Sequence, residues 1–326
     1  MTLGRLVGLL TEHQFLSGQE LAVQLGVTRA AVWKQVETLR GLGYEIEAYP
    51  RQGYRLLSRP DRLYPWEIAQ GLRTKLLGKT IEYYDELSST NQRAKELLVS
   101  CPEGTVVLAE SQTAGRGRLG RRWFSPPGTG IWMSLILRPQ LPPAQLSKLT
   151  LVAAVALSQA IFAELEVRPL VKWPNDLYWN GRKLSGILTE LTGEMGRLES
   201  VVLGVGLNVN QKPEDFPEEI REQAGSLWMI KKSPVDRKAL LRRYLEVLEV
   251  EYFRALTDGF DRILEYCRQY TYTLGRHVTV TNGAQTFSGI AVAIDEDGGL
   301  IIDQDGQSRK VIAGDVNLTA QYLTEG

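Results

Sequence analysis

Four arginines lie within seven residues of one short segment, SQTAGRGRLGRRW at residues 111–123: Arg116, Arg118, Arg121 and Arg122. Three glycines are interleaved with them, and Trp123 ends the run with a flat aromatic ring. Glycines let successive backbone N–H groups converge on one point, and arginine adds planar cationic donors, so this segment suits an anionic ligand such as a phosphate. It joins two expected apolar strands, TVVLAE and IWMSLIL. A loop held by such a scaffold favours a binding site over a solvated basic tail.

Two further places carry residues that suit the same chemistry. The segment KWPND, residues 172–176, sets Lys172, Asn175 and Asp176 around a proline. The lysine suits a phosphate, whereas the amide and the carboxylate suit a ribose, an adenine or a metal ion, although Asn-Asp is also common in turns. Lys183 follows an expected hairpin turn inside an otherwise apolar strand, where the alternative is an edge-strand lysine that points to water.

A cluster of small polar residues marks a third place. Ser88, Ser89, Thr90 and Asn91 lie where an expected strand, IEYYDEL, meets an expected helix. One of them caps that helix. The others would line a helix N-terminus that can bind polar groups of a ligand.

The composition limits the chemistry. The chain has 38 basic and 38 acidic residues, so its formal net charge is zero and the arginine-rich segment is a local feature. Only two cysteines and two histidines occur (Cys101, Cys267, His13 and His277), and none lies near a recognisable motif. A histidine triad or a zinc hydrolase is therefore not expected. Arginine, lysine, carboxylates, amides and backbone dipoles must carry the chemistry, and they suit charge stabilisation at a phosphate or carboxylate.

The length and hydropathy indicate a cytoplasmic protein. With 326 residues and 43% hydrophobic residues, the chain has room for two or three domains. We expect no apolar run near the length of a membrane span, and no membrane partner. The N-terminus lacks the apolar segment and cleavage site of a signal peptide.

The first 62 residues predict a winged helix-turn-helix. SGQELAVQLG begins with a Ser–Glu capping box, TRAAVWKQVETLR forms a second helix, and two alternating segments follow around a Pro/Gly turn. The second helix and the turn carry the candidate DNA-binding residues, which are Thr28, Arg29, Ala30, Trp33, Lys34, Arg51 and Arg55. The alternative is a small packing or protein–protein module, since helix-turn-helix shapes also serve in that role.

The remaining chain predicts two more domains. Strands and helices alternate over residues 63–269, with Asn180-Gly181 as a type I′ hairpin turn, which indicates an α+β catalytic domain with a mainly antiparallel mixed sheet. Short strands with close turns over residues 270–326 indicate a small SH3-like β-barrel.

Four of these segments, taken together, identify a family. STN, GRGRLGRRW, KWPND and RKLSGILTE, in this order, resemble the catalytic domain of biotin protein ligases. Because the winged helix and the C-terminal barrel match as well, the whole chain resembles the bifunctional form, the biotin operon repressor that is also a biotin–carboxyl-carrier ligase. The stretch 211–235 is the part where the family varies.

The resemblance implies a two-step reaction. Biotin's carboxylate attacks the α-phosphate of ATP with Mg²⁺, giving biotinyl-5′-AMP and pyrophosphate. A lysine of the biotin carboxyl-carrier protein then attacks the acyl carbon and releases AMP. The resemblance also implies that the adenylate-bound form is a homodimer that binds operator DNA.

The resemblance further assigns roles to residues of this chain. Lys183 and Arg118 would be catalytic, and Asp176 would hold the metal. Biotin would contact Ser89, Thr90, Asn91, Gln112, Arg116, Gly117, Arg118, Lys183, Gly186, Leu188, Gly204 and Gly206, where the glycines leave a narrow apolar slot. The nucleotide would contact Arg118, Arg121, Trp123, Lys172, Asn175, Asp176, Asn208 and Trp228.

Two alternatives for the function stay open. A lipoate or octanoate ligase shares this catalytic fold, and a biotin-sensing regulator that has lost catalysis would share the whole architecture.

The arginine-rich loop suggests a hypothesis about regulation. Four like charges in one glycine-rich loop should repel one another, so we expect the loop to be mobile until a ligand phosphate orders it. Such a loop could act as an order–disorder switch that couples ligand binding to dimerisation.

Overall fold

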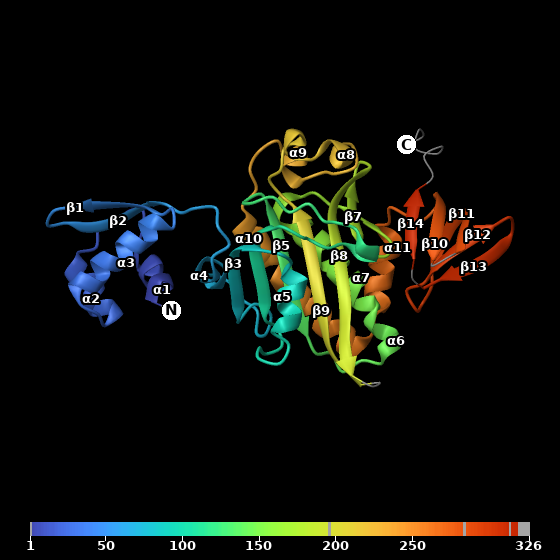
Figure 1. The fold of residues 1–326 in the computed structure, drawn as a ribbon, viewed down its shortest axis with the longest axis horizontal. Helices are drawn as coiled ribbons and strands as arrows, with labels where there is room; N and C mark the ends of the chain where they lie inside the picture. The colour runs from blue at the N-terminus through green and yellow to red at the C-terminus, as the bar shows by residue number, and fades with distance from the viewer. Residues whose placement is uncertain (1, 195–196, 283–284, 313, 319–326) are drawn as a thin grey trace. The chain divides into compact units, whose positions relative to one another are not determined.

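The computed structural model describes residues 2–194, 197–282, 285–312 and 314–318. The chain forms two compact units, Met1–Leu72 and Arg73–Gly326 (Figure 1). The domain boundaries expected at 62/63 and 269/270 remain predictions.

The first unit has the elements of a winged helix-turn-helix. Its helices are α1 (Thr2–Leu9), α2 (Gly18–Leu25), α3 (Arg29–Gly41) and α4 (Pro65–Ala69), and its hairpin pairs β1 (Glu45–Tyr49) with β2 (Gly53–Ser58). The capping box is present, because Ser17 accepts from the Glu20 N–H at 3.1 Å and Glu20 accepts from the Ser17 N–H at 2.8 Å. The prediction for this region is therefore confirmed.

Helix α4 lies beyond residue 62 but packs within the first unit. The indole of Trp66 donates to the Tyr44 hydroxyl at 2.8 Å, and that hydroxyl donates to Glu67 at 2.6 Å. Trp66 also covers Gly4 of α1, where a Cβ atom would overlap it. These contacts tie α4 to the winged helix.

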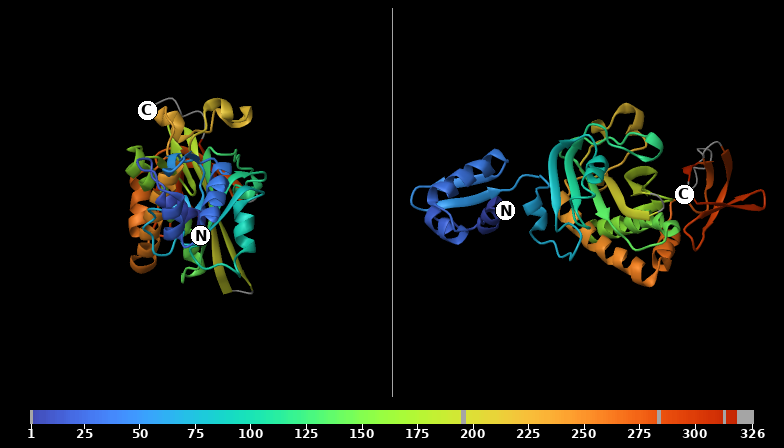
Figure 2. Two further views of the ribbon diagram at one scale, coloured as in Figure 1. Left: turned by 90° about the vertical axis from the view of Figure 1, so that its left-hand side faces the viewer. Right: turned by 60° about the horizontal axis from the view of Figure 1, so that its bottom comes forward.

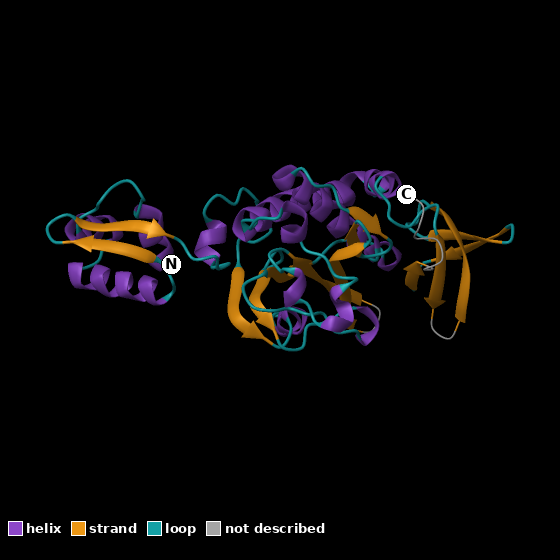
Figure 3. Ribbon diagram, turned by 90° about the horizontal axis from the view of Figure 1, so that it is seen from above, coloured by secondary structure: helices purple, strands orange, loops and turns teal. Residues whose placement is uncertain are grey.

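The second unit contains a mixed sheet of seven strands. Figure 3 distinguishes the strands and helices by colour. The order is β3 (Ile81–Leu87), β4 (Val106–Gln112), β5 (Gly130–Leu137), β9 (Arg197–Asn208), β8 (Arg182–Glu194), β7 (Asp176–Trp179) and β6 (Leu170–Lys172). Strands β3 and β4 are parallel, and every other neighbouring pair is antiparallel. The turn between β7 and β8 is Asn180-Gly181 with positive φ at both residues, as the sequence predicts. The prediction of an α+β fold with a mainly antiparallel mixed sheet is confirmed.

Helices cover both faces of this sheet. Helix α5 (Thr90–Glu96) packs on β4, β5 and β9, whereas α7 (Lys148–Leu165), α10 (Arg237–Asp258) and α11 (Asp261–Gln269) lie behind the sheet (Figures 1 and 2). The remaining helices are short: α6 (Pro143–Leu146), α8 (Glu218–Arg221) and α9 (Leu227–Lys231). Strands β4 and β5 are almost entirely buried between these layers, so the core runs through the centre of the sheet.

The expectation that no apolar run approaches a membrane span is wrong. The segment Pro143–Leu165 has 23 residues and is long and apolar enough to cross a membrane by length and composition. Within its most apolar stretch, 72% of the residues are buried inside the fold. Its hydrophobicity thus serves the contact of α7 with the sheet and with α10.

The C-terminal strands form a five-stranded antiparallel sheet. Its order is β13 (Gln307–Val311), β12 (Leu300–Gln304), β11 (Gln285–Ile294), β10 (His277–Asn282) and β14 (Asp315–Leu318). This sheet attaches to the KWPND bend, where the buried Trp173 donates its indole N–H to the Gly298 carbonyl at 2.9 Å. The bend therefore lies between the large sheet and the C-terminal one.

Candidate functional site

One cavity of about 300 Å³ collects most of the residues that the sequence analysis selected. This volume is in the range of small-molecule sites. The cavity is bounded by the arginine-rich loop, β8, β9, the KWPND bend, residues 216–224 and β14. The predicted residues that line it are Ser89, Thr90, Asn91, Gln112, Arg116, Gly117, Arg118, Arg121, Trp123, Lys172, Asn175, Asp176, Lys183, Gly186, Leu188, Gly204, Gly206 and Asn208.

Trp228 is not brought to this cavity in the described part of the chain. Ser226 caps α9 and accepts from the Met229 N–H at 3.2 Å, and the Trp228 ring lies against Lys212 and Lys232, whose amines are 5.5 and 6.0 Å from it. The same stretch supplies other lining residues that the sequence analysis missed, which are Phe216, Ile220, Gln223 and Ala224. The sequence signal that could have pointed to these lining residues is the few apolar residues spaced through an otherwise charged stretch.

One end of the cavity is a network of amides and hydroxyls. The backbone N–H and the hydroxyl of Thr90 both donate to Gln112 Oε1, at 2.8 and 3.2 Å. Gln112 Nε2 donates to Ser125 Oγ at 2.9 Å, which fixes the orientation of the Gln112 amide. Ser89 caps α5, as expected for one of the residues 88–91. This end offers fixed polar groups to an uncharged polar ring.

Asn91 is held from both sides. Its Oδ1 lies 2.5 Å from the Ser134 hydroxyl, and its Nδ2 donates to Glu190 at 2.8 Å. Lys95 donates to the other oxygen of Glu190 at 2.6 Å. Burial acts to raise the pKa of the Glu190 carboxyl, but the hydrogen bonds from Lys95 and Asn91 outweigh burial and hold this pKa below its usual value. Ser134 and Lys95 lie outside the four motifs, and Glu190 ends RKLSGILTE without an assigned role, so the sequence analysis missed all three.

The glycines of β8 and β9 make room for two side chains of the cavity. A Cβ atom at Gly204 would overlap Asn91, and one at Gly206 would overlap Trp123. A Cβ atom at Gly186 would lie 3.0 Å from the Trp123 ring. The apolar slot expected at these glycines is thus partly filled by Asn91 and Trp123. The indole N–H of Trp123 is buried against Gly206 and has no hydrogen-bond partner among the described residues.

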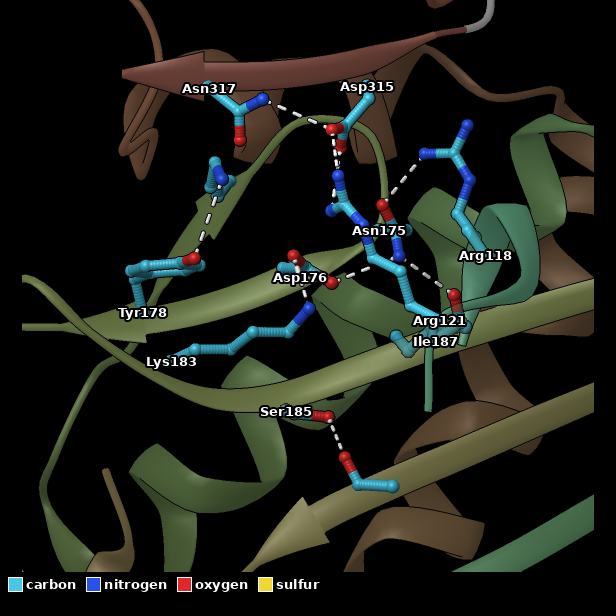
Figure 4. Close-up of polar contacts among 12 residues, drawn as sticks. Arg118, Arg121, Asn175, Asp176, Tyr178, Lys183, Ser185, Ile187, Asp315 and Asn317 are labelled. Atoms are coloured by element: carbon cyan, nitrogen blue, oxygen red, sulfur yellow. Dashed lines mark hydrogen bonds and ion pairs between the residues drawn. The ribbon is translucent and has the colours of Figure 1, made fainter. Parts of the chain in front are cut away.

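The other end of the cavity is ionic (Figure 4). Lys183 Nζ lies 2.6 Å from Asp176 Oδ2, so Lys183 is an ion-paired residue of the cavity and not an edge lysine that points to water. Asn175 Nδ2 donates to Asp176 Oδ1 at 3.0 Å, and Asn175 Oδ1 accepts from Arg118 Nη1 at 2.9 Å. The KWPND bend therefore connects the two residues expected to be catalytic.

Strand β14 completes this ionic end from the far C-terminal part of the chain. Arg118 Nη2 donates to the Gly314 carbonyl at 3.2 Å, and Arg121 is ion-paired with Asp315. Burial acts to raise the pKa of Asp315, but the hydrogen bonds from Arg121 and Asn317 outweigh burial and lower this pKa. Sequence reasoning missed Asp315 because nearly 200 residues separate it from Arg121.

The cations of this end are partly desolvated. Burial lowers the pKa of the Arg118 guanidinium and of the Lys172 amine, while the charge of Asp176 opposes the shift in both. Lys172 Nζ donates to the Tyr178 hydroxyl at 3.4 Å, and burial raises the pKa of that hydroxyl. Cations held with little water around them interact strongly with an added anion.

The arginine-rich loop is a narrow hairpin. Gly117 N donates to the Arg121 carbonyl at 2.7 Å, and Trp123 N donates to the Gly115 carbonyl at 2.9 Å. At the tip, Leu119 has φ 56° and is 72% exposed. The backbone of the loop is thus organised by its own hydrogen bonds, and the order–disorder switch remains a prediction.

The cavity offers few ligands for a metal ion. The described residues contain no group of three or more His, Cys, Asp or Glu side chains that could hold one. Among the described residues, Asp176 and Asp315 are the carboxylates that line the cavity, and each is paired with a cation. Mg²⁺ commonly takes one or two carboxylates and completes its shell with water and substrate phosphates, so this donor set fits a metal that is shared with a polyphosphate.

The candidate DNA-binding residues lie on the first unit. Arg29, Ala30, Trp33 and Lys34 are exposed along α3, and Thr28 caps that helix by accepting from the Ala31 N–H at 3.2 Å. Arg51 is exposed at the hairpin turn. Arg55 is already engaged, because it pairs with Glu47 at 2.6 Å and lies 4.7 Å from the centre of the Phe15 ring.

Three family models match separate parts of the chain. Residues 83–208 match the Biotin/lipoate A/B protein ligase family, residues 4–55 match an HTH domain, and residues 273–318 match the Biotin protein ligase C terminal domain. The chain is 42% identical over 307 residues to the bifunctional ligase/repressor BirA of Bacillus subtilis, with 94% of each chain covered. It is 32% identical over 321 residues to BirA of Escherichia coli, with 96% of each covered. Among solved structures, the biotin protein ligase of Aquifex aeolicus in complex with biotin and ATP aligns with a TM-score of 0.67 and 31% identity, covering 74% of this chain and 99% of that one.

Proposed function

Since this chain belongs to the family of bifunctional biotin ligases and repressors, we propose that its cavity activates biotin with ATP and passes it to a carrier-protein lysine. The first step joins a biotin carboxylate oxygen to the α-phosphorus and breaks the bond from that phosphorus to the bridging oxygen, so pyrophosphate leaves. In the second step the lysine amine attacks the acyl carbon. The bond from that carbon to the phosphate oxygen breaks, AMP leaves, and the amine loses a proton.

The amide and hydroxyl end of the cavity receives the ureido ring. Thr90, Gln112 and Asn91 present donors and acceptors whose directions are fixed by their partners Ser125, Ser134 and Glu190. A site with fixed polar groups rejects analogues that leave those groups unpaired, which gives selectivity for a ring with matching partners. Trp123 and Leu188 then flank the apolar part of the substrate.

The ionic end receives the carboxylate and the phosphates. Arg118, Arg121, Lys172 and Lys183 provide fixed positive charges where both steps concentrate negative charge, and preorganised charge of this kind is usually the largest contribution to catalysis. Lys183 and Arg118 act on the reacting carboxylate and α-phosphate. Asp176 would hold Mg²⁺ together with the phosphates, and the ion would supply further charge neutralisation there.

The base of the nucleotide lies on the wall made by Phe216, Ile220 and Ala224, with Asn208 nearby. The wall is apolar and close to Phe124, whose ring centre is 6.4 Å from that of Phe216. This assignment replaces the expected contact with Trp228.

The first unit makes the protein a biotin-responsive repressor. Exposed Arg29, Trp33 and Lys34 on α3 suit a major groove, and Arg51 suits a phosphate of the backbone. We further propose that the adenylate-bound protein is a homodimer that binds operator DNA, that the protein works in the cytoplasm, and that the C-terminal sheet closes as an SH3-like barrel.

The observation that carries this proposal is that one cavity holds both an organised amide network around Gln112 and a cluster of cations around Asp176. The test is to incubate the protein with Mg²⁺, ATP, biotin and a biotin carrier domain, and to measure pyrophosphate and biotin on the carrier lysine. Lipoate and octanoate serve as competing substrates. Preferential transfer of lipoate or octanoate would support the related ligase class, and binding of biotin without pyrophosphate release would leave a sensor without catalysis.

A further inference from the structure

The backbone of Lys183 is supported by the variable stretch 211–235. Strand β9 ends at Asn208, and its pairing with β8 begins at Ser185. Residues 182–184, at the start of β8, therefore have no partner in β9. Residues 223–225 take this place, because Lys183 N donates to the Gln223 carbonyl at 2.7 Å and Gly225 N donates to the Lys183 carbonyl at 2.9 Å. Lys183 is thus paired on one side with Tyr178 of β7 and on the other with residues 223–225.

Arg182 fastens this short pairing. Its Nη1 donates to the carbonyls of Arg221 and Ala224, at 2.7 and 3.1 Å. The close approach needs Gly225, where a Cβ atom would lie 2.9 Å from Arg182 Cβ. Asn208 Nδ2 also donates to the Gly225 carbonyl, at 2.9 Å. Arg182 does not itself line the cavity among the described residues, so it touches the site only through other residues.

The same stretch presents the apolar wall to the cavity. The Arg221 side chain donates to the Phe216 carbonyl at 3.2 and 3.1 Å, which joins the wall to the segment that Arg182 holds. Two hydrogen bonds join the ends of the stretch: Asn210 accepts from the Val235 N–H at 2.8 Å and donates to the Val235 carbonyl at 3.0 Å. One hydrogen-bonded segment, residues 210–235, therefore carries both the apolar wall at Phe216 and Ala224 and the residues that pair with Lys183.

We propose that Arg182 is a positioning residue, and that residues 221–225 couple the occupant of the apolar wall to the alignment of Lys183. The inference rests on the proposed function of the cavity. The Lys183 amine sits at the end of a flexible four-carbon side chain, so its position depends on how firmly the backbone is held. A nucleotide base on the wall holds residues 221–225 against β8 and thereby fixes the lysine at the reacting groups.

The experiment compares the full-length wild type with Arg182→Ala, Arg182→Lys and Arg309→Ala. Arg309 is the matched control, because it is an exposed arginine on β13 that lies outside the cavity and outside residues 221–225. Pyrophosphate release gives kcat and KM for ATP, direct titration gives the Kd for biotin, and hydrogen exchange reports the Lys183 and Gly225 amides with and without a non-hydrolysable ATP analogue.

For Arg182→Ala we expect kcat to fall at least about tenfold, since a misplacement of about 1 Å can cost on the order of 100-fold. The Kd for biotin should stay within about twofold of wild type, because the amide network does not involve Arg182. The Lys183 and Gly225 amides should exchange faster, and the ATP analogue should protect them less. Arg182→Lys should restore part of the rate, because an amine can still donate to a carbonyl, and Arg309→Ala should match wild type.

Two results would overturn the inference: a wild-type kcat for folded Arg182→Ala, or exchange at the two amides that does not respond to the substitution. If Arg182→Ala does not fold, Arg182→Lys decides by the same two measurements. The exchange measurement does not depend on the reaction. A wild type that releases no pyrophosphate but shows the expected exchange pattern would therefore contradict the proposed function and leave the support of Lys183 standing.

Discussion

Lys183 Nζ lies 2.6 Å from Asp176 Oδ2, and this ion pair is one end of a connected row of side chains. Asp176 accepts from Asn175, and Asn175 in turn accepts from Arg118. The two cations expected to act in catalysis are therefore fixed through one carboxylate and one amide of the KWPND bend. In the proposed reaction, an incoming carboxylate or phosphate would meet these two cations in paired positions, which would lower the reorganisation that the reaction requires.

Removing the Lys183 amine should slow the first step. A charge-assisted contact contributes roughly 1.5–3 kcal/mol, so Lys183→Ala should reduce the rate of pyrophosphate release by at least about tenfold. The matched control is Lys79→Ala, which removes an exposed lysine outside the cavity. An unchanged rate of pyrophosphate release for Lys183→Ala would show that the ion pair with Asp176 is structural only.

Adding a methyl group at Gly206 should displace the Trp123 ring and narrow the cavity. The new Cβ atom would overlap Trp123, and overpacking of this kind costs about 1–3 kcal/mol. We therefore expect Gly206→Ala to weaken biotin binding about tenfold or more in a calorimetric titration. The control is Gly41→Ala, at a glycine outside the cavity that has no positive φ and no atom near its Cβ position, and it should leave biotin binding unchanged. Equal biotin affinity for Gly206→Ala and wild type would contradict the packing of the Trp123 ring against Gly206.

The pair of Glu190 with Lys95 and Asn91 should make stability depend on pH. Because the pKa of Glu190 in the fold lies below its ordinary value of 4.5, the ionised form stabilises the fold fully above that value. This contribution is lost as the pH falls through the lowered pKa. Wild type should therefore exceed Glu190→Gln in the free energy of unfolding at pH 7, and the difference should shrink below about pH 4.5. Urea unfolding of both proteins between pH 3 and pH 7 measures it, and a difference that grows toward acid pH would reverse the assigned sign.

The local elements could be predicted from the sequence because their signals are local. The Ser17–Glu20 capping box, the Asn180-Gly181 turn and the apolar stripe of α3 each lie within a few residues, and each appears in the structure. The polar clusters of the cavity were predictable where they occur in short motifs, as at Gln112 and Asp176.

The supporting residues could not be predicted, because their partners are distant in the chain. Ser134 reaches Asn91 across 43 positions, and Arg121 reaches Asp315 across 194. In the stretch 211–235, the family resemblance predicts that Trp228 contacts the nucleotide. The short helix α9 instead turns Trp228 toward Lys212, and Phe216 lines the cavity.

The exposed cations of α3 should contribute to DNA binding. Arg29→Ala with Lys34→Ala should weaken operator binding by the full-length protein, and each phosphate contact that is lost should reduce the slope of log Kd against log salt by about one. Fluorescence anisotropy with operator DNA at several salt concentrations measures both quantities. Since Arg55 is already paired with Glu47, Arg55→Ala should change this slope less than the double variant does. Equal slopes for the double variant and wild type would show that Arg29 and Lys34 of α3 do not contact DNA phosphates.

If the ionic end of the cavity holds the phosphate of biotinyl-5′-AMP, the dissociation rate of that adenylate should depend on Arg118. Arg118 links the loop to Asn175 and to Gly314, so Arg118→Gly removes a phosphate contact and loosens the loop in one substitution. With adenylate formed from biotin and ATP on each protein, we expect Arg118→Gly to release it at least about tenfold faster than wild type. Lysines of bystander proteins should then become biotinylated. Equal dissociation rates for the two proteins, with biotin found only on the carrier lysine, would contradict the account.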